Sequence, residues 1–201
     1  MSQRFIPITG GTTVGLVFKD GVILASEKRF SYGHYVVSRS AKKVFKVAPH
    51  VGAACAGLVS DMQTLIRESQ IYAELFRLDN KRPIPVRSAA KLVSNLLFGM
   101  RLIPFLTQTI IGGVDDEGPA VYALDPLGSV IEDKYVAIGS GAEIAAGVLE
   151  EGYKDGLSEK EAKELALRTV KSAISRDAIS GDGVDLIILR KSGVKEESIS
   201  F

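Results

Sequence analysis

TTVGLVFKDGVILA, residues 12–25, places two β-branched and apolar runs on either side of Lys19, Asp20 and Gly21. Such runs around Asp-Gly predict a β-hairpin, because this dipeptide readily takes the positive φ angles of a tight turn. Further short strands are predicted at residues 34–38, 42–48 and 51–57, which read HYVVS, KKVFKVA and VGAACAG. The chain therefore begins with a run of strands.

Helical spacing replaces this pattern after Ser60, which can form a capping box with Gln63. The residues predicted to face inward on this first helix are Met62, Leu65, Ile66, Ser69, Tyr72, Ala73 and Phe76. After the helix-breaking RPIP, a second helix is predicted over about residues 86–100, burying Ala89, Val93, Leu96, Leu97 and Met100. Two consecutive amphipathic helices are expected to pack together.

The second half of the chain repeats the order of strands and then helices. Four strands, assigned to a second sheet, are predicted at residues 105–113, 119–125, 129–133 and 135–139. A short helix follows Gly141, a longer one runs over about 158–176 with Ser158 and Glu161 as its capping box, and residues 183–191 close as a strand. This order favours an α+β fold in which helix pairs flank two packed sheets.

The overall composition is that of one globular domain. The 201 residues include 25 Lys and Arg against 24 Asp and Glu, without a basic cluster longer than a pair, which argues against nucleic acid and anionic membranes as partners. No apolar run reaches the roughly 20 residues of a membrane span. The single Cys55 lies in an apolar run and is interpreted as a buried, inert thiol, so a cytoplasmic protein is predicted.

Four polar features stand out: Glu27, Lys43, Ser140 in GSG, and Asp177 with Ser180 in SRDAISGDG. Each also has a purely structural explanation. Glu27 and Lys43 suit an ion pair, Ser140 suits a helix cap, and the last segment suits a helix stop rich in turn residues.

Several motifs in one order carry a resemblance that covers residues 11–190: TTVGLVFKDGVILASEKR, AKKVFKV, CAGLVSDMQTLIR, LDPLGS, GSGAEIAAGVLEEGY and RDAISGDGVDL. In these the chain resembles the β subunits of archaeal 20S proteasomes, which are N-terminal nucleophile hydrolases. The resemblance implies a four-layer αββα sandwich, with residues 1–11 as a propeptide-like segment and 12–201 as one domain. It also implies partners: α subunits and other β subunits in stacked seven-membered rings, unfolded polypeptides as substrates, and a regulatory ATPase acting through the α ring.

The same resemblance implies roles for the polar residues. In this family a threonine exposed by propeptide removal is the nucleophile, and its own α-amine is the base, since a free amine has a pKa of roughly 7.7–8.0 whereas a peptide nitrogen is not basic. Lys43 matches the active-site lysine and Glu27 the acid that pairs with it, and the Gly57 N–H matches the oxyanion donor. The group that orders the terminal amine is matched by Ser140, Asp177 and Ser180.

The departure from the family lies at the nucleophile. Active relatives usually begin T-T-x-x-G with the acid 16 positions after the first threonine, which puts Gly11 in the nucleophile's position when Glu27 is the acid. A one-residue gap instead makes Thr12 the nucleophile, released by cleavage after Gly11. Moving the hydroxyl by one residue shifts it about 3.3 Å and turns it to the other face of the strand. The favoured hypothesis is therefore a subunit without its own nucleophile, and the alternative is a threonine endopeptidase using Thr12.

Other chemistries fit less well. Gly139-Ser140-Gly141 between a strand and a helix suggests a nucleotide-binding loop, but Ile144 occupies the third glycine position and no alternating βαβ context surrounds it. A serine hydrolase would need a G-x-S-x-G elbow, which the chain lacks. No cofactor and no metal are expected, since Cys and His ligands do not cluster.

Overall fold

The computed structural model describes residues 10–200, so most of the predicted segment 1–11 lies outside the described residues. The helices are α1 (Val59–Asn80), α2 (Val86–Gly99), α3 (Ala142–Gly152) and α4 (Glu159–Ile174). The strands are β1 (Thr12–Phe18), β2 (Gly21–Glu27), β3 (Phe30–Tyr32), β4 (Tyr35–Ser38), β5 (Val44–Ala48), β6 (Val51–Gly57), β7 (Thr107–Asp115), β8 (Gly118–Leu124), β9 (Val130–Asp133), β10 (Tyr135–Gly139), β11 (Val184–Arg190) and β12 (Gly193–Ile199).

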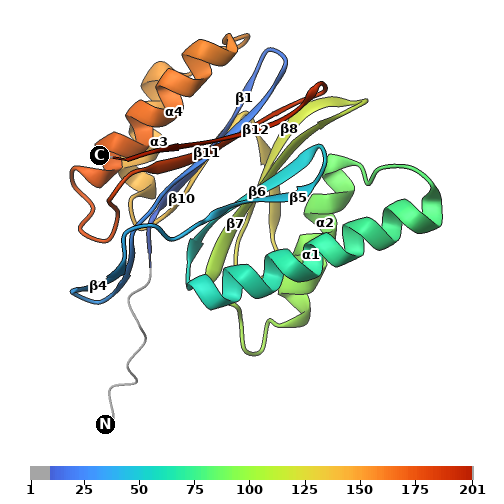
Figure 1. The fold of residues 1–201 in the computed structure, drawn as a ribbon, viewed down its shortest axis with the longest axis horizontal. Helices are drawn as coiled ribbons and strands as arrows, with labels where there is room; N and C mark the ends of the chain where they lie inside the picture. Colours follow the sequence, from blue (N-terminus) through green and yellow to red (C-terminus); the bar gives the residue numbers. More distant parts are fainter. Residues whose placement is uncertain (1–9, 201) are drawn as a thin grey trace.

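Two five-stranded antiparallel sheets form the centre of the molecule (Figure 1). One sheet has the order β10-β1-β2-β11-β12 and is covered by α3 and α4, whereas the other has the order β5-β6-β7-β8-β9 and is covered by α1 and α2. A small third sheet, β3-β4, projects from the end of β2. The predicted four-layer αββα sandwich is thus confirmed.

Apolar residues fill all three spaces between the four layers. One cluster lies under α1 and α2 and includes Met62 and Leu97, and a second lies under α3 and α4 and includes Leu16 and Leu149. The third lies between the sheets and includes Leu24 and Ile110. Burial of both faces of each sheet explains why strands such as β2 and β6 consist of continuous apolar and small residues.

The strand β10 corrects the predicted assignment to sheets. Residues 135–139 were expected in the second sheet, but β10 pairs antiparallel with β1, from Thr12 opposite Gly139 to Leu16 opposite Tyr135. Strands β9 and β10 are separated by one residue, so the chain crosses from one sheet to the other there. Local pattern could not show this crossover, since it depends on which sheet edge is open.

The hairpin β1–β2 is confirmed, but the reason given for its glycine is wrong. Gly21 does not take a positive φ. A Cβ at this position would instead collide with the carbonyl oxygen of Leu189 on the neighbouring strand β11. The glycine is required by close backbone approach rather than by turn geometry.

Helix boundaries are confirmed to within a few residues, with two local corrections. The Ser158–Glu161 capping box of α4 is present, but α1 begins at Val59 without a side-chain cap because Ser60 is already helical. Tyr72 and Met100, predicted as buried, are 47% and 44% exposed. Strands β3 and β12 were not predicted. Among residues 10–200, no helix has the length and apolar character needed to cross a membrane.

Candidate active site

The start of β1 presents two neighbouring backbone positions to different surroundings. Gly11 precedes β1 with a φ of 128°, and a Cβ built on it would overlap Oε1 of Glu27 and lie 3.0 Å from Nζ of Lys43. The hydroxyl of Thr12 instead lies 2.7 Å from Oγ of Ser180. The α-carbon of residue 11 therefore faces the acid and the lysine, and the side chain of residue 12 does not.

Alternation along β1 explains this division. Val14 and Leu16 lie in the core beneath α3 and α4, on the face of β1 that Thr12 shares. Thr13 lies on the opposite face, where its hydroxyl is 2.6 Å from Oγ of Ser26 and donates to the carbonyl of Cys55 at 2.9 Å. By the same period of two, Gly11 shares the face of Thr13.

Glu27 and Lys43 form a buried ion pair that joins the two sheets. Their side chains are 0% and 1% exposed, and Nζ of Lys43 also donates to the carbonyl of Arg29 at 2.5 Å. The second carboxylate oxygen of Glu27 accepts from the backbone N–H groups of Arg29 at 2.7 Å and Gly181 at 3.0 Å. Burial raises the pKa of Glu27 above its ordinary value, and the attraction of Lys43 opposes this rise.

A second polar group consists of Ser140, Asp177 and Ser180. Ser140 and Ser180 each donate to Oδ2 of Asp177 at 2.6 Å. Since the Ser180 proton is directed to Asp177, the Thr12 hydroxyl is the donor to Ser180. The backbone N–H of Gly11 donates to Oγ of Ser140 at 2.9 Å. This group thus holds the chain on both sides of the Gly11–Thr12 peptide bond.

The end of β6 approaches the same place. A Cβ on Gly139 would collide with the carbonyl oxygen of Gly11 and lie 2.8 Å from Cβ of Ala56. Gly139 therefore lies between Gly11 and Ala56, and Ala56 is the residue before Gly57. Gly57 itself has a φ of 132° and lies opposite Thr107 in the ladder. The structure therefore brings all the predicted site residues to one end of β1, while the oxyanion role of Gly57 stays a prediction.

Arg29 and Asp182 were not identified from the sequence. Nε of Arg29 donates to Asp182 at 2.8 Å, and its guanidinium also donates to the carbonyl of Ala178 at 3.1 Å. Through its backbone Arg29 holds both Glu27 and Lys43, so it connects the ion pair to the loop that carries Asp177 and Ser180. The signal available in the sequence was only that Arg29 follows Glu27 by two positions and that Asp182 lies in the turn-rich SGDG.

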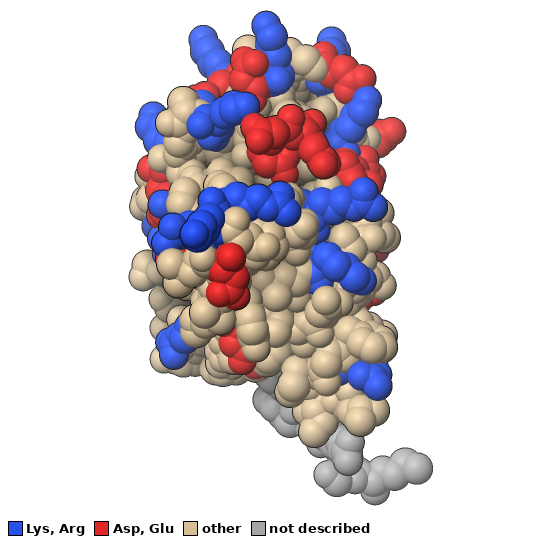
Figure 2. Space-filling model, turned by 90° about the vertical axis from the view of Figure 1, so that its right-hand side faces the viewer, with Lys and Arg blue, Asp and Glu red and all other residues tan. Residues whose placement is uncertain are grey.

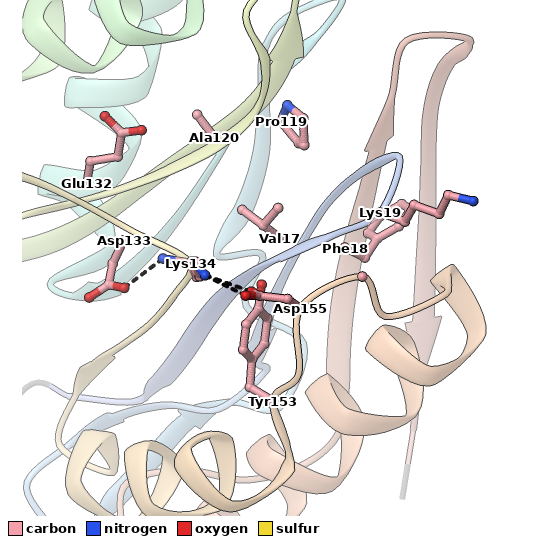
Figure 3. A pocket seen from close by; sticks show the side chains of 11 residues that line it. Val17, Phe18, Lys19, Pro119, Ala120, Glu132, Asp133, Lys134, Tyr153 and Asp155 are labelled. Atoms are coloured by element: carbon pink, nitrogen blue, oxygen red, sulfur yellow. Dashed lines mark hydrogen bonds and ion pairs between the residues drawn. The ribbon is translucent and has the colours of Figure 1, made fainter.

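Two further features are Cys55, which lies beside this site, and a cavity at the other end of β1. Burial raises the pKa of the Cys55 thiol to about 12, so the thiolate is not available as a nucleophile at neutral pH. Residues 10–200 contain no group of side chains arranged to hold a metal ion. A cavity of about 760 Å³, lined by residues such as Val17, Pro119 and Tyr153, lies at the other end of β1 and contains none of the predicted site residues (Figure 3).

Comparison with known proteins agrees with this arrangement. The family described as Proteasome subunit matches residues 8–189. The chain belongs to the proteasome subunit family. It is 51% identical to "Proteasome subunit beta 1" of Cenarchaeum symbiosum over 187 residues, covering 93% of this chain and 96% of the relative. It is 46% identical to "Proteasome subunit beta 2" of Caldivirga maquilingensis over all 201 residues, covering 100% of both chains.

A third relative, "Proteasome subunit beta 1" of Desulfurococcus amylolyticus, is 47% identical over 191 residues, which are 95% of each chain. The suspected resemblance to archaeal proteasome β subunits is thus confirmed. The matched residues 8–189 include helices α1 to α4 and every predicted site residue, and they end within β11.

Proposed function

We propose that this chain is a β-type subunit of a proteasome core particle that has no nucleophile of its own and acts structurally beside a catalytic β subunit. One observation carries the proposal: the backbone position that faces Glu27 and Lys43 is Gly11, which has no side chain. N-terminal nucleophile chemistry needs a hydroxyl and a free α-amine at one residue. Gly11 supplies no hydroxyl.

The placement of Thr12 supports the same proposal. Its hydroxyl is fully buried and donates to Ser180, on the side of β1 away from Lys43. Cleavage after Gly11 would create an amine at Thr12, but its oxygen would still need to cross the strand. The ladder holds Thr12 opposite Gly139 and Thr13 opposite Ser26, which opposes such a slip. A misplacement of even about 1 Å can cost on the order of 100-fold in rate.

The remaining parts of the proposal concern the particle. We place this subunit in a ring with other β subunits, stacked on α subunits and located in the cytoplasm. Its contribution is to wall an enclosed chamber in which a catalytic paralogue cuts unfolded polypeptides delivered by an ATPase. The family match and the β-subunit relatives support this assignment.

N-terminal sequencing of this chain from assembled particles, paired with peptide hydrolysis by particles carrying Thr12→Ala, tests the assignment. We expect a chain that does not begin at Thr12, and unchanged hydrolysis in the variant because the catalytic paralogue supplies it. A chain that begins at Thr12, together with loss of one hydrolytic activity in Thr12→Ala, would establish the alternative of a catalytic threonine subunit.

A gain-of-function variant sharpens this test. Gly11→Thr creates a Gly-Thr junction and puts a hydroxyl on the position that faces Lys43. We expect this variant, measured by intact mass, to lose residues 1–10 and to react with a threonine-directed covalent inhibitor at residue 11. Gly11→Val is the matched control, since it has nearly the same shape without the hydroxyl, and it should stay uncut and unlabelled.

A further inference from the structure

Gln108, near the start of β7, makes a contact that the proposed function does not use. Its Oε1 accepts a hydrogen bond of 2.7 Å from the backbone N–H of Gly139, the last residue of β10. The two residues belong to different sheets. Since a backbone N–H only donates, the oxygen of the Gln108 amide must face it, and not the nitrogen. The contact therefore fixes which way this side-chain amide is turned.

The alternation of side chains along β7 directs Gln108 toward the other sheet. Ile110, two positions later, lies in the apolar cluster between the sheets, whereas Ile111 lies in the cluster under α1 and α2. Gln108 shares the face of Ile110 by the period of two, and it lies opposite Ala56, close to the end of β6. Because Gln108 is exposed and Ile110 is fully buried, the glutamine stands where the layer between the sheets meets solvent, at the end that carries the candidate site.

Three polar contacts join the two sheets at this end, and they follow the order of the strands. The buried ion pair described above joins β2 to the residue before β5. Thr13 joins β1 to β6 through the carbonyl of Cys55. Gln108 joins β7 to β10 through Gly139. Since β1 lies between β10 and β2 in its sheet, the ion pair and the Gln108 contact flank the start of β1 on its two sides.

Gly139 contacts the residue at position 11 as well as Gln108. It lies opposite Thr12 in the ladder, and a Cβ built on it would overlap the carbonyl oxygen of Gly11. The next residue, Ser140, accepts from the Gly11 N–H at 2.9 Å. Gly139 has a φ of 95° and no side chain, so its backbone could adopt other conformations unless a contact holds it. Gln108 supplies such a contact.

We propose that Gln108 is a positioning residue: through Gly139 it holds position 11 in the place that faces the buried ion pair. The inference rests on the proposed function, because that function makes position 11 the place where the nucleophile is missing. With glycine there, the contact keeps the shape of the site. With threonine there, it would determine how fast the hydroxyl reacts, since a misplacement of about 1 Å can cost on the order of 100-fold in rate.

The Gly11→Thr chain in assembled particles is the reporter for this role. The rate constant for labelling of residue 11 by a threonine-directed covalent inhibitor is followed by intact mass, which distinguishes this chain from the other subunits. Gln108→Leu in this background keeps a side chain of similar size and removes the acceptor. We expect the labelling rate constant to fall about tenfold or more, and the loss of residues 1–10 to slow as well. An unchanged rate constant would overturn the inference.

Gln108→Glu separates positioning from a loss of packing. Its carboxylate keeps an oxygen that can accept from Gly139, so most of the labelling rate should be recovered. The reaction needs an uncharged α-amine, and the added negative charge raises the pKa of that amine, so the rise of the pH–rate profile should move to higher pH. Glu27, Lys43 and Asp177 are the same in every variant. A Glu variant that is as slow as the Leu variant would contradict the role of the hydrogen bond.

Gln70→Leu in the same background is the matched control. Gln70 is exposed on α1, and its side-chain amide donates to the carbonyl of Lys46 on β5 at 2.7 Å. The variant therefore removes one hydrogen bond of the same length between a side chain and the backbone of another element. We expect it to be labelled as fast as Gly11→Thr alone. A loss as large as that of Gln108→Leu would mean that any weakened contact slows labelling.

Hydrogen exchange in particles that contain the unsubstituted chain gives a readout that needs no nucleophile. Because the Gly139 amide is bonded to Gln108, Gln108→Leu should exchange it about tenfold faster or more, as resolved within residues 135–141 by mass spectrometry. Gln70→Leu should leave this exchange unchanged. Equal exchange of Gly139 with and without Gln108 would overturn the inference.

The outcomes also separate this inference from the proposed function. If Gly11→Thr enters particles but is neither cut nor labelled, position 11 is not the place of the nucleophile and the proposed function fails. If Gly11→Thr reacts and the addition of Gln108→Leu leaves its rate unchanged, only the role of Gln108 fails.

Discussion

The two ends of the sandwich differ in what they contain. The cavity end has about 760 Å³ of open space, and its best-defined ion pair, Lys134–Asp155 at 2.7 Å, is largely exposed (Figure 3). At the end that carries the candidate site, the side chains are closely packed. Glu27 and Lys43 are buried, and the hydroxyls of Thr12 and Ser180 are hydrogen-bonded to each other. Val17, which lines the cavity, lies five positions after Thr12 on β1, or roughly 17 Å along the strand.

The end of the sandwich that contains the cavity is therefore not the end at which the predicted catalytic residues form a hydrogen-bond network. Charged residues of both signs are interspersed over the upper part of the side shown in Figure 2, as expected for a solvated surface. Buried, fully bonded charges occur at the other end, where they cost desolvation free energy and require a specific partner. In this chain the hydrogen-bond network, rather than concavity, identifies the candidate site.

The largest expected effect comes from removing one member of the buried pair. Lys43→Ala leaves the Glu27 carboxylate buried without its cation and should lower the free energy of unfolding by about 3–5 kcal/mol, measured by urea denaturation. Lys134→Ala at the cavity end is the matched control and should leave the denaturation midpoint unchanged, because water solvates Asp155. Similar losses of stability in both variants would contradict the expected difference between the buried pair at the site and the exposed pair at the cavity.

A double variant that removes both charges tests whether the unpaired charge causes the loss of stability in Lys43→Ala, and we expect it to fold. Glu27→Gln combined with Lys43→Met removes both charges and keeps side chains of similar length. It should be more stable than Lys43→Ala, since no unpaired charge stays buried. A double variant no more stable than the single one would show that packing of the lysine stem, and not its charge, is what matters.

An intermediate effect is expected from alanine at two glycines with similar backbone angles. Gly11 has a φ of 128° and Gly118, in the hairpin between β7 and β8, a φ of 115°. Such a φ costs a residue with a side chain about 1–3 kcal/mol. Only at Gly11 would the new Cβ also meet Glu27 and Lys43, whereas nothing lies within 4 Å at Gly118. Thermal unfolding should therefore show Gly11→Ala to be clearly the less stable variant, and equal losses would contradict the close approach at the site.

The smallest effect concerns acid pH. The hydrogen bond and charge of Arg29 hold the pKa of Asp182 below its usual value of 3.8. A depressed folded-state pKa stabilises the protein above the unfolded value and loses that contribution as pH falls below it. Between about pH 5 and pH 3, Asp182→Asn should lose less stability than the wild type, by about 1 kcal/mol or less for a partly exposed pair.

Asn is a suitable replacement in that measurement because Asp182 has a φ of 69°, which Asn tolerates. Denaturation at a series of pH values would contradict the expectation if the Asp182 variant followed the wild-type curve.

Much of the fold was predictable because its signals are local. The β1–β2 hairpin, the helix boundaries and the Ser158–Glu161 capping box follow from neighbouring residues alone. The crossover of β10 to the β1 edge, the exposure of Tyr72 and the need for glycine at position 21 were not predictable, since each depends on a strand or layer distant in the sequence. Strand β12 was missed because its three consecutive charged residues, Lys195, Glu196 and Glu197, lack the apolar signal of a buried strand.

Composition and spacing were enough to predict the helices and most of the strands in their order, the polar residues of the site and two possible positions of a nucleophile. The packed fold was needed to show that Gly11 faces Glu27 and Lys43 while Thr12 faces Ser180. The physical reason is that a strand has two faces with a period of two, and spacing alone does not say which face meets which neighbour until both sheets and α4 are packed around it.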